Sequence, residues 1–231
     1  MKKLGLIGGM GPQSTVPYYM NIVYGVQERT SKDFFPNLTI ESLNVFEILK
    51  MIGENRLDDL TDHFLGALQN LKNAGADLAA LTANTAHIVF DRLKERSPLP
   101  LVSIVEATAD EAVRRGVTRL ALLGTKFTME QDFYKKPFER AGIEVVVPNK
   151  KERQYIDEKI TSELEFGKVL DDTRINFARI IDRMLVEEGT TAVILGCTEL
   201  PMLLNDEVSP IPCLDTVSIH SAALIEAILA D

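Results

Sequence analysis

Two stretches of this chain repeat one pattern at an offset of 114 residues (197 minus 83). Residues 78–87 read Leu-Ala-Ala-Leu-Thr-Ala-Asn-Thr-Ala-His, and residues 192–200 read Ala-Val-Ile-Leu-Gly-Cys-Thr-Glu-Leu. In each copy an apolar run stops at a small residue and a polar pair. Ala83 matches Cys197, so only the second copy carries a thiol.

The repeat extends beyond these two stretches. Residues 3–10 resemble residues 119–126, and Ser-Pro-Leu-Pro-Leu at 97–101 resembles Ser-Pro-Ile-Pro-Cys at 209–213. Three matches in one order at nearly one spacing indicate a duplicated half-domain, because solenoid repeats run to roughly 20–50 residues. We expect a first lobe of residues 1–97 plus 211–231, completed by the C-terminal helix, and a second lobe of residues 98–210.

Short apolar runs alternate with helix-period segments, which is typical of α/β proteins with mainly parallel sheets flanked by helices. The expected strands cover residues 3–8, 37–43, 77–82, 101–104, 119–123, 143–147, 191–195 and 211–214. The expected helices cover residues 13–28, 59–73, 85–95, 105–115, 130–141, 153–164, 171–188 and 216–229. Because ligands of open α/β sheets bind beyond the carboxyl ends of the strands, the segments that follow them should line an active-site cleft between the lobes.

Composition excludes several classes of protein. A net charge of −9 argues against a nucleic-acid surface, although an acidic chain can still hold a locally positive pocket. No apolar run approaches the roughly 20 residues of a membrane span, and the first apolar run breaks at Gly8-Gly9, too early for a signal peptide. Two cysteines form no disulfide framework, so we expect a reduced, cytoplasmic protein. Three histidines without ligand spacing predict no metal site.

A glycine-rich turn follows the first expected strand. In Gly8–Pro12 a dinucleotide fingerprint would place its third glycine at Ser14, so a nucleotide site is the weaker interpretation. A purely structural turn stays open as an alternative. Backbone N–H groups at the start of a helix can hold a carboxylate, and we therefore predict that Gly9, Met10 and Gln13 bind a small anion.

Cys197 is the strongest single candidate for catalysis. It follows an apolar strand and precedes a helix-start pattern, and a helix N-terminus lowers the pKa of a thiol and favours the thiolate. The alternative is an inert buried cysteine, which is the interpretation given to Cys213 in Pro-Ile-Pro-Cys-Leu. Thr198 and Glu199 follow Cys197 directly and are predicted to contact the substrate.

The matching position in the first copy carries no reactive group. Ala83 has no side chain for acid–base work, and the hydroxyl of Thr82 is a much poorer acid or base than a thiol. Strand alternation also points Thr82 and Ala83 in opposite directions. Asn84 and Thr85 offer donors at a helix start, which suits a carboxylate.

Five further residues complete the candidate site. Thr125 and Thr128 follow the first strand of the second lobe and can hold a carboxylate oxygen. Lys168, preceded by Gly167, is a loop cation that either binds substrate or is simply solvated. His87 either lines the site or supports the helix, and His220 is predicted to support the structure near Cys197.

Taken together, these residues resemble the aspartate/glutamate racemase family, which is related to hydantoin racemases and arylmalonate decarboxylases. The likeness rests on Ile7–Pro12, Asn84–His87, Leu195–Leu200 and the stretch 212–220. It implies two α/β lobes related by a pseudo-twofold axis and, often, a homodimer. It also implies two cysteines that remove and return the substrate α-proton from opposite faces without pyridoxal phosphate or another cofactor.

The chain departs from this family pattern at one place, because the first family cysteine falls on Ala83. By the family's logic Cys197 serves the L-enantiomer, so we expect an impaired or one-sided racemase of aspartate or glutamate. Lys168 and the 9–14 loop would bind the side-chain carboxylate of this small dicarboxylic amino acid. Asn84, Thr85, Thr125 and Thr198 would bind its α-carboxylate.

Two other functions remain open on the sequence. A malonate decarboxylase needs only one thiol to protonate an enolate from one face, which matches the single cysteine. A protein that binds a dicarboxylate with little catalysis is the second alternative.

Overall fold

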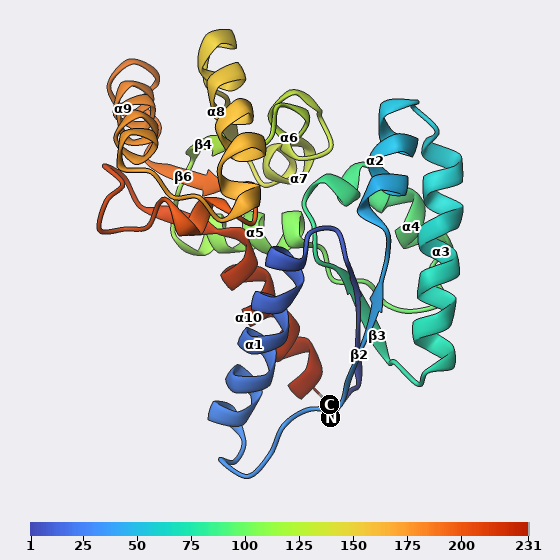
Figure 1. The fold of residues 1–231 in the computed structure, drawn as a ribbon. Helices are drawn as coiled ribbons and strands as arrows, with labels where there is room; N and C mark the ends of the chain where they lie inside the picture. Colours follow the sequence, from blue (N-terminus) through green and yellow to red (C-terminus); the bar gives the residue numbers. More distant parts are fainter. Residues whose placement is uncertain (231) are drawn as a thin grey trace. The chain divides into compact units, whose positions relative to one another are not determined.

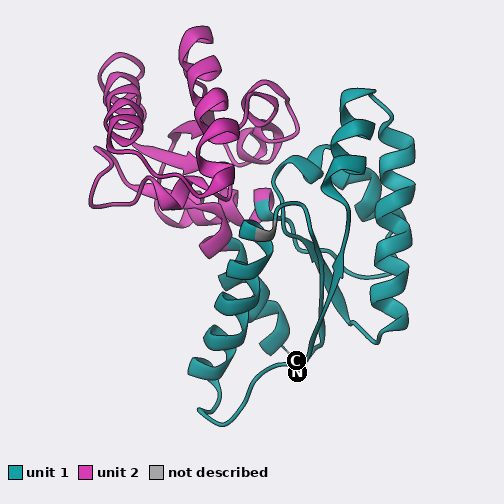
Figure 2. Cartoon of the chain, in the orientation of Figure 1, with its two compact units in different colours: residues 1–104, 220–231 teal, residues 105–219 magenta. Residues whose placement is uncertain are grey.

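The structure is a computed structural model that describes residues 1–230, apart from the side chain of Pro12. It divides into two compact units, one made of Met1–Ile104 with His220–Asp231 and the other of Val105–Ile219 (Figure 2). Each unit is a parallel sheet flanked by helices, which confirms the expected α/β class. None of the helices within the described residues is long and apolar enough to cross a membrane.

The first unit is built on a sheet of three parallel strands. Strand β1 (Leu4–Gly8) lies between β2 (Leu38–Ser42) and β3 (Leu78–Leu81). A single parallel bridge between Ala79 and Leu101 extends the sheet beyond β3. All residues of β1 and β3 are buried, as expected for parallel strands covered on both faces.

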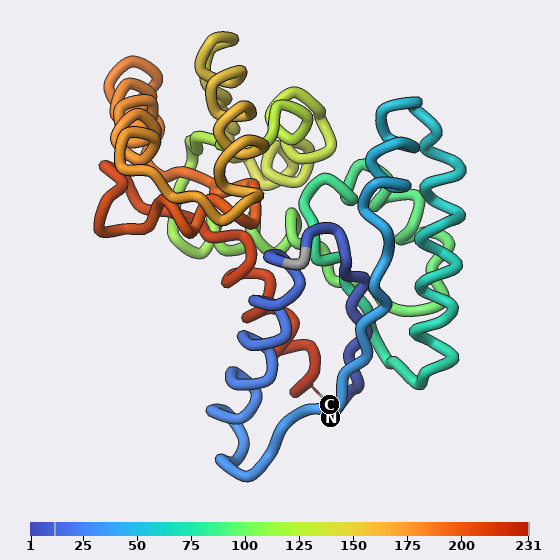
Figure 3. Tube along the Cα trace, in the orientation of Figure 1, coloured from blue at the N-terminus to red at the C-terminus, as the bar shows by residue number. Residues whose placement is uncertain are grey.

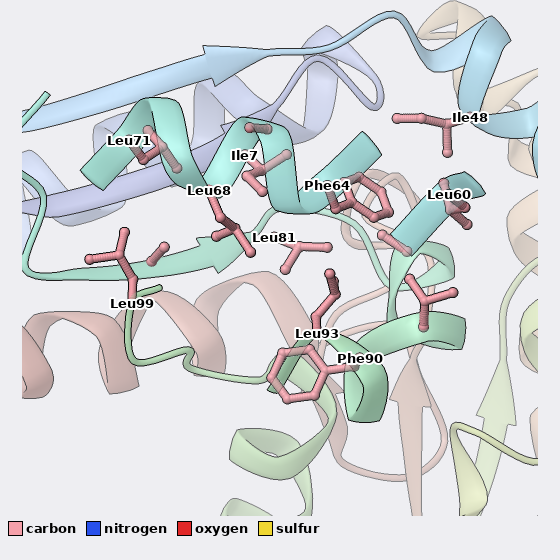
Figure 4. Close-up of a cluster of buried hydrophobic side chains, with 14 of the residues drawn as sticks. Ile7, Ile48, Leu60, Phe64, Leu68, Leu71, Leu81, Phe90, Leu93 and Leu99 are labelled. Carbon is pink, nitrogen blue, oxygen red and sulfur yellow. The ribbon is translucent and has the colours of Figure 1, made fainter. Parts of the chain in front are cut away.

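Helices on the first unit enclose a hydrophobic core. They are α1 (Pro12–Arg29), α2 (Val45–Gly53), α3 (Leu57–Asn73), η1 (Thr85–Val89), α4 (Phe90–Arg96) and the end of α10 (Thr216–Leu229) (Figure 1). Helix α3 buries Leu60, Phe64 and Leu68 at a spacing of four residues, which places them on one face. Figure 4 shows these side chains in one cluster with Ile7 of β1 and Leu81 of β3. This cluster fixes the ends of β1 and β3, from which the first half of the candidate site extends.

The second unit repeats the arrangement with one more strand. Its parallel sheet has the order β5 (Glu144–Val146), β4 (Arg119–Leu123), β6 (Ala192–Leu195) and β7 (Cys213–Asp215). Its helices, which can be followed by colour in Figure 3, are α5 (Ile104–Arg114), α6 (Lys126–Glu130), α7 (Lys135–Arg140), α8 (Lys150–Ser162), η2 (Leu164–Phe166), α9 (Asp171–Glu188) and η3 (Leu200–Met202).

The duplication read from the sequence is present in the backbone hydrogen bonds. The N–H of Ala79 donates to the carbonyl of Pro100 at 2.9 Å, and the N–H of Val193 donates to that of Pro212 at the same distance. The two acceptors, Pro100 and Pro212, occupy equivalent positions in the two Ser-Pro-x-Pro segments. The bridge at Leu101 is thus the first unit's counterpart of strand β7.

Several elements differ from the sequence prediction. The expected strand 101–104 reduces to the bridge at Leu101, because α5 already begins at Ile104. The expected helix 130–141 is shorter and begins later, as α7 at Lys135, because the chain is extended at Gln131. The short helix α6, which Thr125 caps, was not predicted. Helix α2 was not predicted, and the expected helix 85–95 starts as a 3₁₀ turn.

The unit boundaries also differ from the expected lobes. They fall at Ile104/Val105 and Ile219/His220 rather than at 97/98 and 210/211. The physical reason at the second boundary is that β7 pairs with β6 through Val193 and Cys213, which ties residues 213–215 to the second sheet. Only the later part of α10 joins the first unit.

Candidate active site

Two neighbouring strands of the second unit end at one edge of the sheet. β4 and β6 are parallel, with Leu123 opposite Leu195, so the loops that follow them start side by side. Glycines let these loops close together. A Cβ on Gly124 would lie 3.2 Å from the carbonyl oxygen of Gly196, and one on Gly196 would lie 2.9 Å from that of Leu123. This close approach brings the Thr125 turn next to the Cys197 loop.

The thiol of Cys197 is bonded to a carboxylate. Cys197 is half-buried, and its Sγ donates to Oε2 of Glu199 at 2.8 Å. The hydroxyl of Thr198 donates to the same oxygen at 2.8 Å. Glu199 is itself buried, with 7% of its surface exposed. One carboxylate oxygen therefore accepts hydrogen bonds from the side chains of Cys197 and Thr198, which both follow β6.

This environment corrects the expectation of a thiol activated by a helix. Burial, together with the negative charge of Glu199, raises the pKa of the Cys197 thiol well above its usual value. The segment after Cys197 is a short 3₁₀ turn, Leu200–Met202, rather than an α-helix, so it supplies little of the dipole that would stabilise a thiolate. Cys197 is held as a neutral thiol beside an acceptor.

Glu165 acts electrostatically on the Cys197 thiol, and the sequence did not single it out. Its negative charge is one of the influences that raise the pKa of the Cys197 thiol. Glu165 lies in the turn η2, three residues before Lys168. Its nearness in sequence to Lys168 is the one feature of the sequence that could have indicated it. The side chain of Lys168 is exposed, and its backbone N–H donates to the carbonyl of Glu163 at 2.9 Å after a left-handed Gly167.

Thr125 and Thr128 form one small polar turn. Thr125 is the N-cap of α6, where its Oγ1 accepts from the N–H of Thr128 at 3.3 Å. The two hydroxyl oxygens lie 3.1 Å apart, and Thr128 is buried. They lie next to the loop of Cys197, and their part in binding a carboxylate stays a prediction.

The glycine-rich loop of the first unit is closed by its own contacts. The N–H of Gly9 donates to Oγ1 of Thr15 at 3.1 Å, so this donor is used inside the loop. Gly9 has φ of 80°, and a Cβ on it would lie 2.3 Å from the carbonyl oxygen of Leu43. Met10 packs against the hydrophobic cluster, and Gln13 lies exposed in the first turn of α1. Among the three predicted anion-binding residues, Gln13 is the one with an exposed polar side chain.

The residues that follow β3 start beside this loop. Both the N–H and the Oγ1 of Thr82 donate to the carbonyl of Ile7, at 3.0 and 3.1 Å, which agrees with a supporting role. Ala83 and Thr85 are half-buried, while Asn84 is buried and its carbonyl accepts from the N–H of His87. The first copy of the repeat thus presents backbone and amide groups where the second presents a thiol.

His87 connects the Ala83 loop to the start of α5. Its Nδ1–H donates to the carbonyl of Ala83 at 3.0 Å, and its Nε2 accepts from the N–H of Ile104 at 3.3 Å. The ring also stacks on Phe90, with centroids 4.8 Å apart. Burial lowers the pKa of the His87 imidazole to about 4, so the ring is neutral at pH 7. Both nitrogens are used, and of the two predicted roles the supporting one fits.

His220 has a similar supporting role, but its partners differ from the expected ones. Its Nε2–H donates to the carbonyl of Val102 at 3.1 Å, and its Nδ1 accepts from the hydroxyl of Tyr18 at 2.7 Å. Burial, and then the neighbouring His87, lower the pKa of His220 to about 3. Both partners, Tyr18 and Val102, belong to the first unit together with His220, whereas Cys197 belongs to the second.

The candidate residues therefore form two groups, one in each unit. The first group gathers after β1 and β3 and contains Gly9, Met10, Gln13, Thr82, Ala83, Asn84, Thr85 and His87. The second gathers after β4 and β6 and contains Thr125, Thr128, Cys197, Thr198 and Glu199, with Glu165 close enough to act on the thiol. The second group contains the one thiol among these candidate residues.

Comparison with known proteins gives consistent matches. Residues 7–224 match the family described as Asp/Glu/hydantoin racemase. A candidate Asp/Glu racemase from Yersinia pestis is 34% identical, with a TM-score of 0.93 over 99% of this chain and 100% of that one. An aspartate racemase homologue from Pyrococcus horikoshii OT3 is 39% identical, with a TM-score of 0.88 over 99% of each chain. The broad specificity amino-acid racemase RacX of Bacillus subtilis is 24% identical over 98% of each chain.

Proposed function

The chain belongs to the Asp/Glu/hydantoin racemase family, and from that premise we propose that it acts on aspartate or glutamate without a cofactor, with Cys197 as its thiol base. Family membership makes the protein an isomerase. The observation that carries the finer proposal is the 2.8 Å hydrogen bond from the Cys197 thiol to the Glu199 carboxylate.

This pair can move a proton in both directions. When the Cys197 sulfur takes the α-proton of an L-amino acid, the thiol proton passes to the carboxylate of Glu199, so the sulfur never needs to exist as a free thiolate. The reverse step returns a proton from the thiol to the carbanion. The raised pKa of the Cys197 thiol keeps the proton on sulfur between these steps. Positioned acid–base catalysis of this kind typically contributes roughly 10²–10⁴-fold.

The proposal includes a one-sided reaction. Ala83 occupies the position of the family's first cysteine and offers no proton donor. The hydroxyl of Thr82 cannot replace it readily, because it is buried and bonded to the carbonyl of Ile7. Return of a proton to the opposite face then depends on water. We expect exchange of the α-proton with retention to be faster than inversion.

The remaining roles in the proposal concern binding. Asn84, Thr85, Thr125 and Thr198 are proposed to bind the α-carboxylate, and Gln13 with Lys168 the side-chain carboxylate. Amide and hydroxyl donors fixed by the fold stabilise the charge that develops on the carboxylate during proton removal. A homodimer and a cytoplasmic location stay predictions.

Proton NMR in deuterated water tests this function directly. Each enantiomer of aspartate and glutamate is incubated with the protein, and loss of the α-proton signal is followed beside chiral chromatography. The proposal expects loss of the signal from an L-form with little D-product. If none of the four compounds exchanges its α-proton, the proposed substrate class is wrong.

One observation favours a second candidate, a malonate decarboxylase that uses a single thiol. A neutral thiol with a raised pKa is the form needed to protonate an enolate after loss of carbon dioxide. The polar donors Asn84 and Thr85 count against this second candidate, because they suit a second carboxylate better than an aryl group. Release of carbon dioxide from a substituted malonate, with no exchange of amino-acid α-protons, would select this function instead.

A further inference from the structure

One buried acid, Glu163, anchors the turn that connects α8 to α9. This turn, residues 164–168, carries Glu165, which acts on the Cys197 thiol, and Lys168, which is proposed to bind substrate. We propose that Glu163 is a positioning residue of the active site, which fixes this turn so that Glu165 stays beside the Cys197 thiol. This role rests on the proposed function of Cys197 and adds to it a residue outside the predicted site.

The carboxylate of Glu163 joins the end of α8 to the start of α9. Its Oε1 forms an ion pair at 2.5 Å with Nζ of Lys159, one turn earlier along α8. Its Oε2 accepts a hydrogen bond at 2.6 Å from the hydroxyl of Thr173, in the first turn of α9. Only 8% of Glu163 and 2% of Thr173 is exposed. Loss of either contact leaves a buried charge incompletely paired, which destabilises the local structure far more than loss of an exposed ion pair.

The backbone of Glu163 holds the turn as well. Its carbonyl accepts from the N–H of Phe166 at 3.1 Å and from the N–H of Lys168 at 2.9 Å. Gly167, between these two donors, has φ of 70°, a left-handed conformation that lets the chain reverse there. One residue therefore fixes the turn through both its carboxylate and its carbonyl, and Glu165 lies within the segment that these bonds enclose.

The charge of Lys168 also reaches Glu163. The ion pair with Lys159 does most to lower the pKa of the Glu163 carboxyl, the hydrogen bond from Thr173 comes next, and the charge of Lys168 adds to both. Glu163 is therefore ionised at neutral pH. Its charge and its carbonyl both act on Lys168, so loss of the carboxylate should loosen the residue that is proposed to bind substrate.

Glu165 lies within electrostatic range of the reactive pair. Partial burial, followed by the negative charge of Glu199, raises the pKa of the Glu165 carboxyl. The charge of Glu165 is in turn one of the influences that raise the pKa of the Cys197 thiol. Because the effect of a like charge falls off with distance, a turn that moved would carry Glu165 away and free the thiol from part of this effect.

Helix α8 is itself fixed to the other loop of the site. Oδ1 of Asp157 in α8 accepts from the N–H of Lys126 at 2.7 Å, and Figure 1 shows α8 and α6 as neighbours in the second unit. Lys126 follows Thr125, whose turn lies next to the Cys197 loop. Movement of the 164–168 turn relative to α8 is therefore movement relative to the thiol.

Iodoacetamide labelling of Cys197 against pH, read by mass spectrometry of its peptide, tests the proposal without any substrate. Glu163→Gln keeps the size of the side chain and removes the ion pair with Lys159. We expect labelling below the wild-type midpoint to become about threefold faster, because the displaced turn takes the charge of Glu165 away from the thiol. An unchanged labelling profile overturns the proposal.

A double variant separates positioning through Glu165 from every other effect. Glu165→Gln removes the charge directly and should accelerate labelling at least as much as Glu163→Gln does. Once Glu165 is neutral, the addition of Glu163→Gln should change nothing further, because Glu163 acts through Glu165. Additive effects of the two changes would show that Glu163 reaches the thiol by another route, and the proposal would be wrong.

The second anchor of the carboxylate gives an independent variant. Thr173→Val removes the hydroxyl at nearly constant volume, so the test does not depend on the folding of one variant. Labelling of Cys197 should become faster, as with Glu163→Gln. Thr173→Ser keeps the hydroxyl and should restore the wild-type profile. A Thr173→Ser variant that behaves like Thr173→Val would contradict the proposed contact.

Glu152→Gln is the matched control. Oε2 of Glu152 accepts at 2.6 Å from Nη2 of Arg183, and this pair also joins α8 to α9, at the end of α8 away from the turn. The control should lower stability in urea and leave the labelling of Cys197 unchanged. Equal acceleration by Glu152→Gln and Glu163→Gln would show a general loosening of the unit, and the positioning role would be wrong.

Exchange of the substrate α-proton in deuterated water separates this role from the proposed function. Glu163→Gln should lower the exchange rate roughly 10–100-fold, because Glu165 and Lys168 are both displaced. Glu152→Gln should exchange at the wild-type rate. A wild type that exchanges no α-proton overturns the proposed function, whereas the labelling profiles decide the positioning role by themselves.

Discussion

The sulfur of Cys197 lies 2.8 Å from Oε2 of Glu199, and the thiol donates its proton to that oxygen. The contact joins the only half-buried cysteine among the described residues to a buried carboxylate. It makes the resting thiol harder to ionise, because burial and a negative neighbour both disfavour the thiolate. In the proposed reaction, the same contact supplies the acceptor for the thiol proton during proton abstraction.

Replacement of the thiol should remove the reaction without removing binding. For Cys197→Ala we expect the rate of α-proton exchange to fall at least 10²–10⁴-fold, because no other thiol stands at the site. Cys213→Ala is the matched control, since Cys213 lies buried in β7 and should cost only stability. NMR in deuterated water measures both rates. Equal rates in the wild type and Cys197→Ala would rule out the assignment.

Glu199→Gln should separate reactivity of the thiol from catalysis. Loss of the carboxylate charge lowers the pKa of Cys197, so the midpoint of iodoacetamide labelling against pH moves to lower pH. Exchange of the substrate α-proton should nevertheless fall, because glutamine cannot accept the thiol proton. A variant whose labelling profile is unchanged would mean that Glu199 does not control the thiol.

Ala83→Cys should restore the missing side of the reaction. By the proposed mechanism, a thiol at this position returns a proton to the face opposite Cys197, so formation of the D-product should rise by about 10²–10⁴-fold. Exchange with retention should change much less. Ala86→Cys, which adds a thiol at a buried position three residues further along the chain, is a control for nonspecific effects of an added thiol. Chiral chromatography of the products reports the result, and no gain in D-product with Ala83→Cys would contradict the prediction.

Stability should decrease as the pH falls below about 6.5, the ordinary pKa of histidine. The folded protein keeps His87 and His220 neutral down to pKa values of about 4 and about 3, whereas the unfolded chain binds protons at both. Stability is therefore fully present above about pH 6.5 and is lost toward pH 4. Between pH 7 and pH 5 we expect a loss on the order of 1–2 kcal/mol per histidine.

Urea unfolding at several pH values measures this loss. The variant His87→Gln should be less stable at pH 7, because it disrupts the bonds to Ala83 and Ile104. Its stability should also depend less steeply on pH, since one of the two neutral histidines is gone. An unchanged slope would mean that His87 does not resist protonation in the folded state.

Two glycines with the same backbone conformation should respond differently to alanine. Gly9 and Gly75 have φ of 80° and 83°, so both variants carry a conformational cost of roughly 1–2 kcal/mol. A Cβ on Gly75 meets nothing within 4 Å, whereas one on Gly9 meets the backbone of Leu43 at 2.3 Å. Urea unfolding should show a clearly larger loss for Gly9→Ala. Equal losses would indicate that the Gly9 loop can move away from Leu43.

Much of the fold could be predicted because its signals are local. Buried parallel strands give continuous apolar runs, and the helix 171–188 was predicted with the bounds it has. The repeat predicted the equivalence of the two Ser-Pro-x-Pro segments, and each of them accepts a backbone hydrogen bond of 2.9 Å at its second proline. The elements that the sequence did not predict correctly were short. Helix α2, helix α6 and the late start of α7 depend on caps and turns too brief to give a periodic signal.

The sequence by itself determined the class of fold, the family and the loss of one thiol at Ala83, since each follows from residue identity and spacing. Only the tertiary structure decided the state of the remaining thiol and the roles of the histidines. The pKa of Cys197 depends on where the Glu199 carboxylate points and how little water reaches it. Likewise, His220 accepts a hydrogen bond from Tyr18, which lies 202 residues away in the chain. Electrostatics and hydrogen bonding act through distance and burial, which the spacing of residues along the chain does not contain.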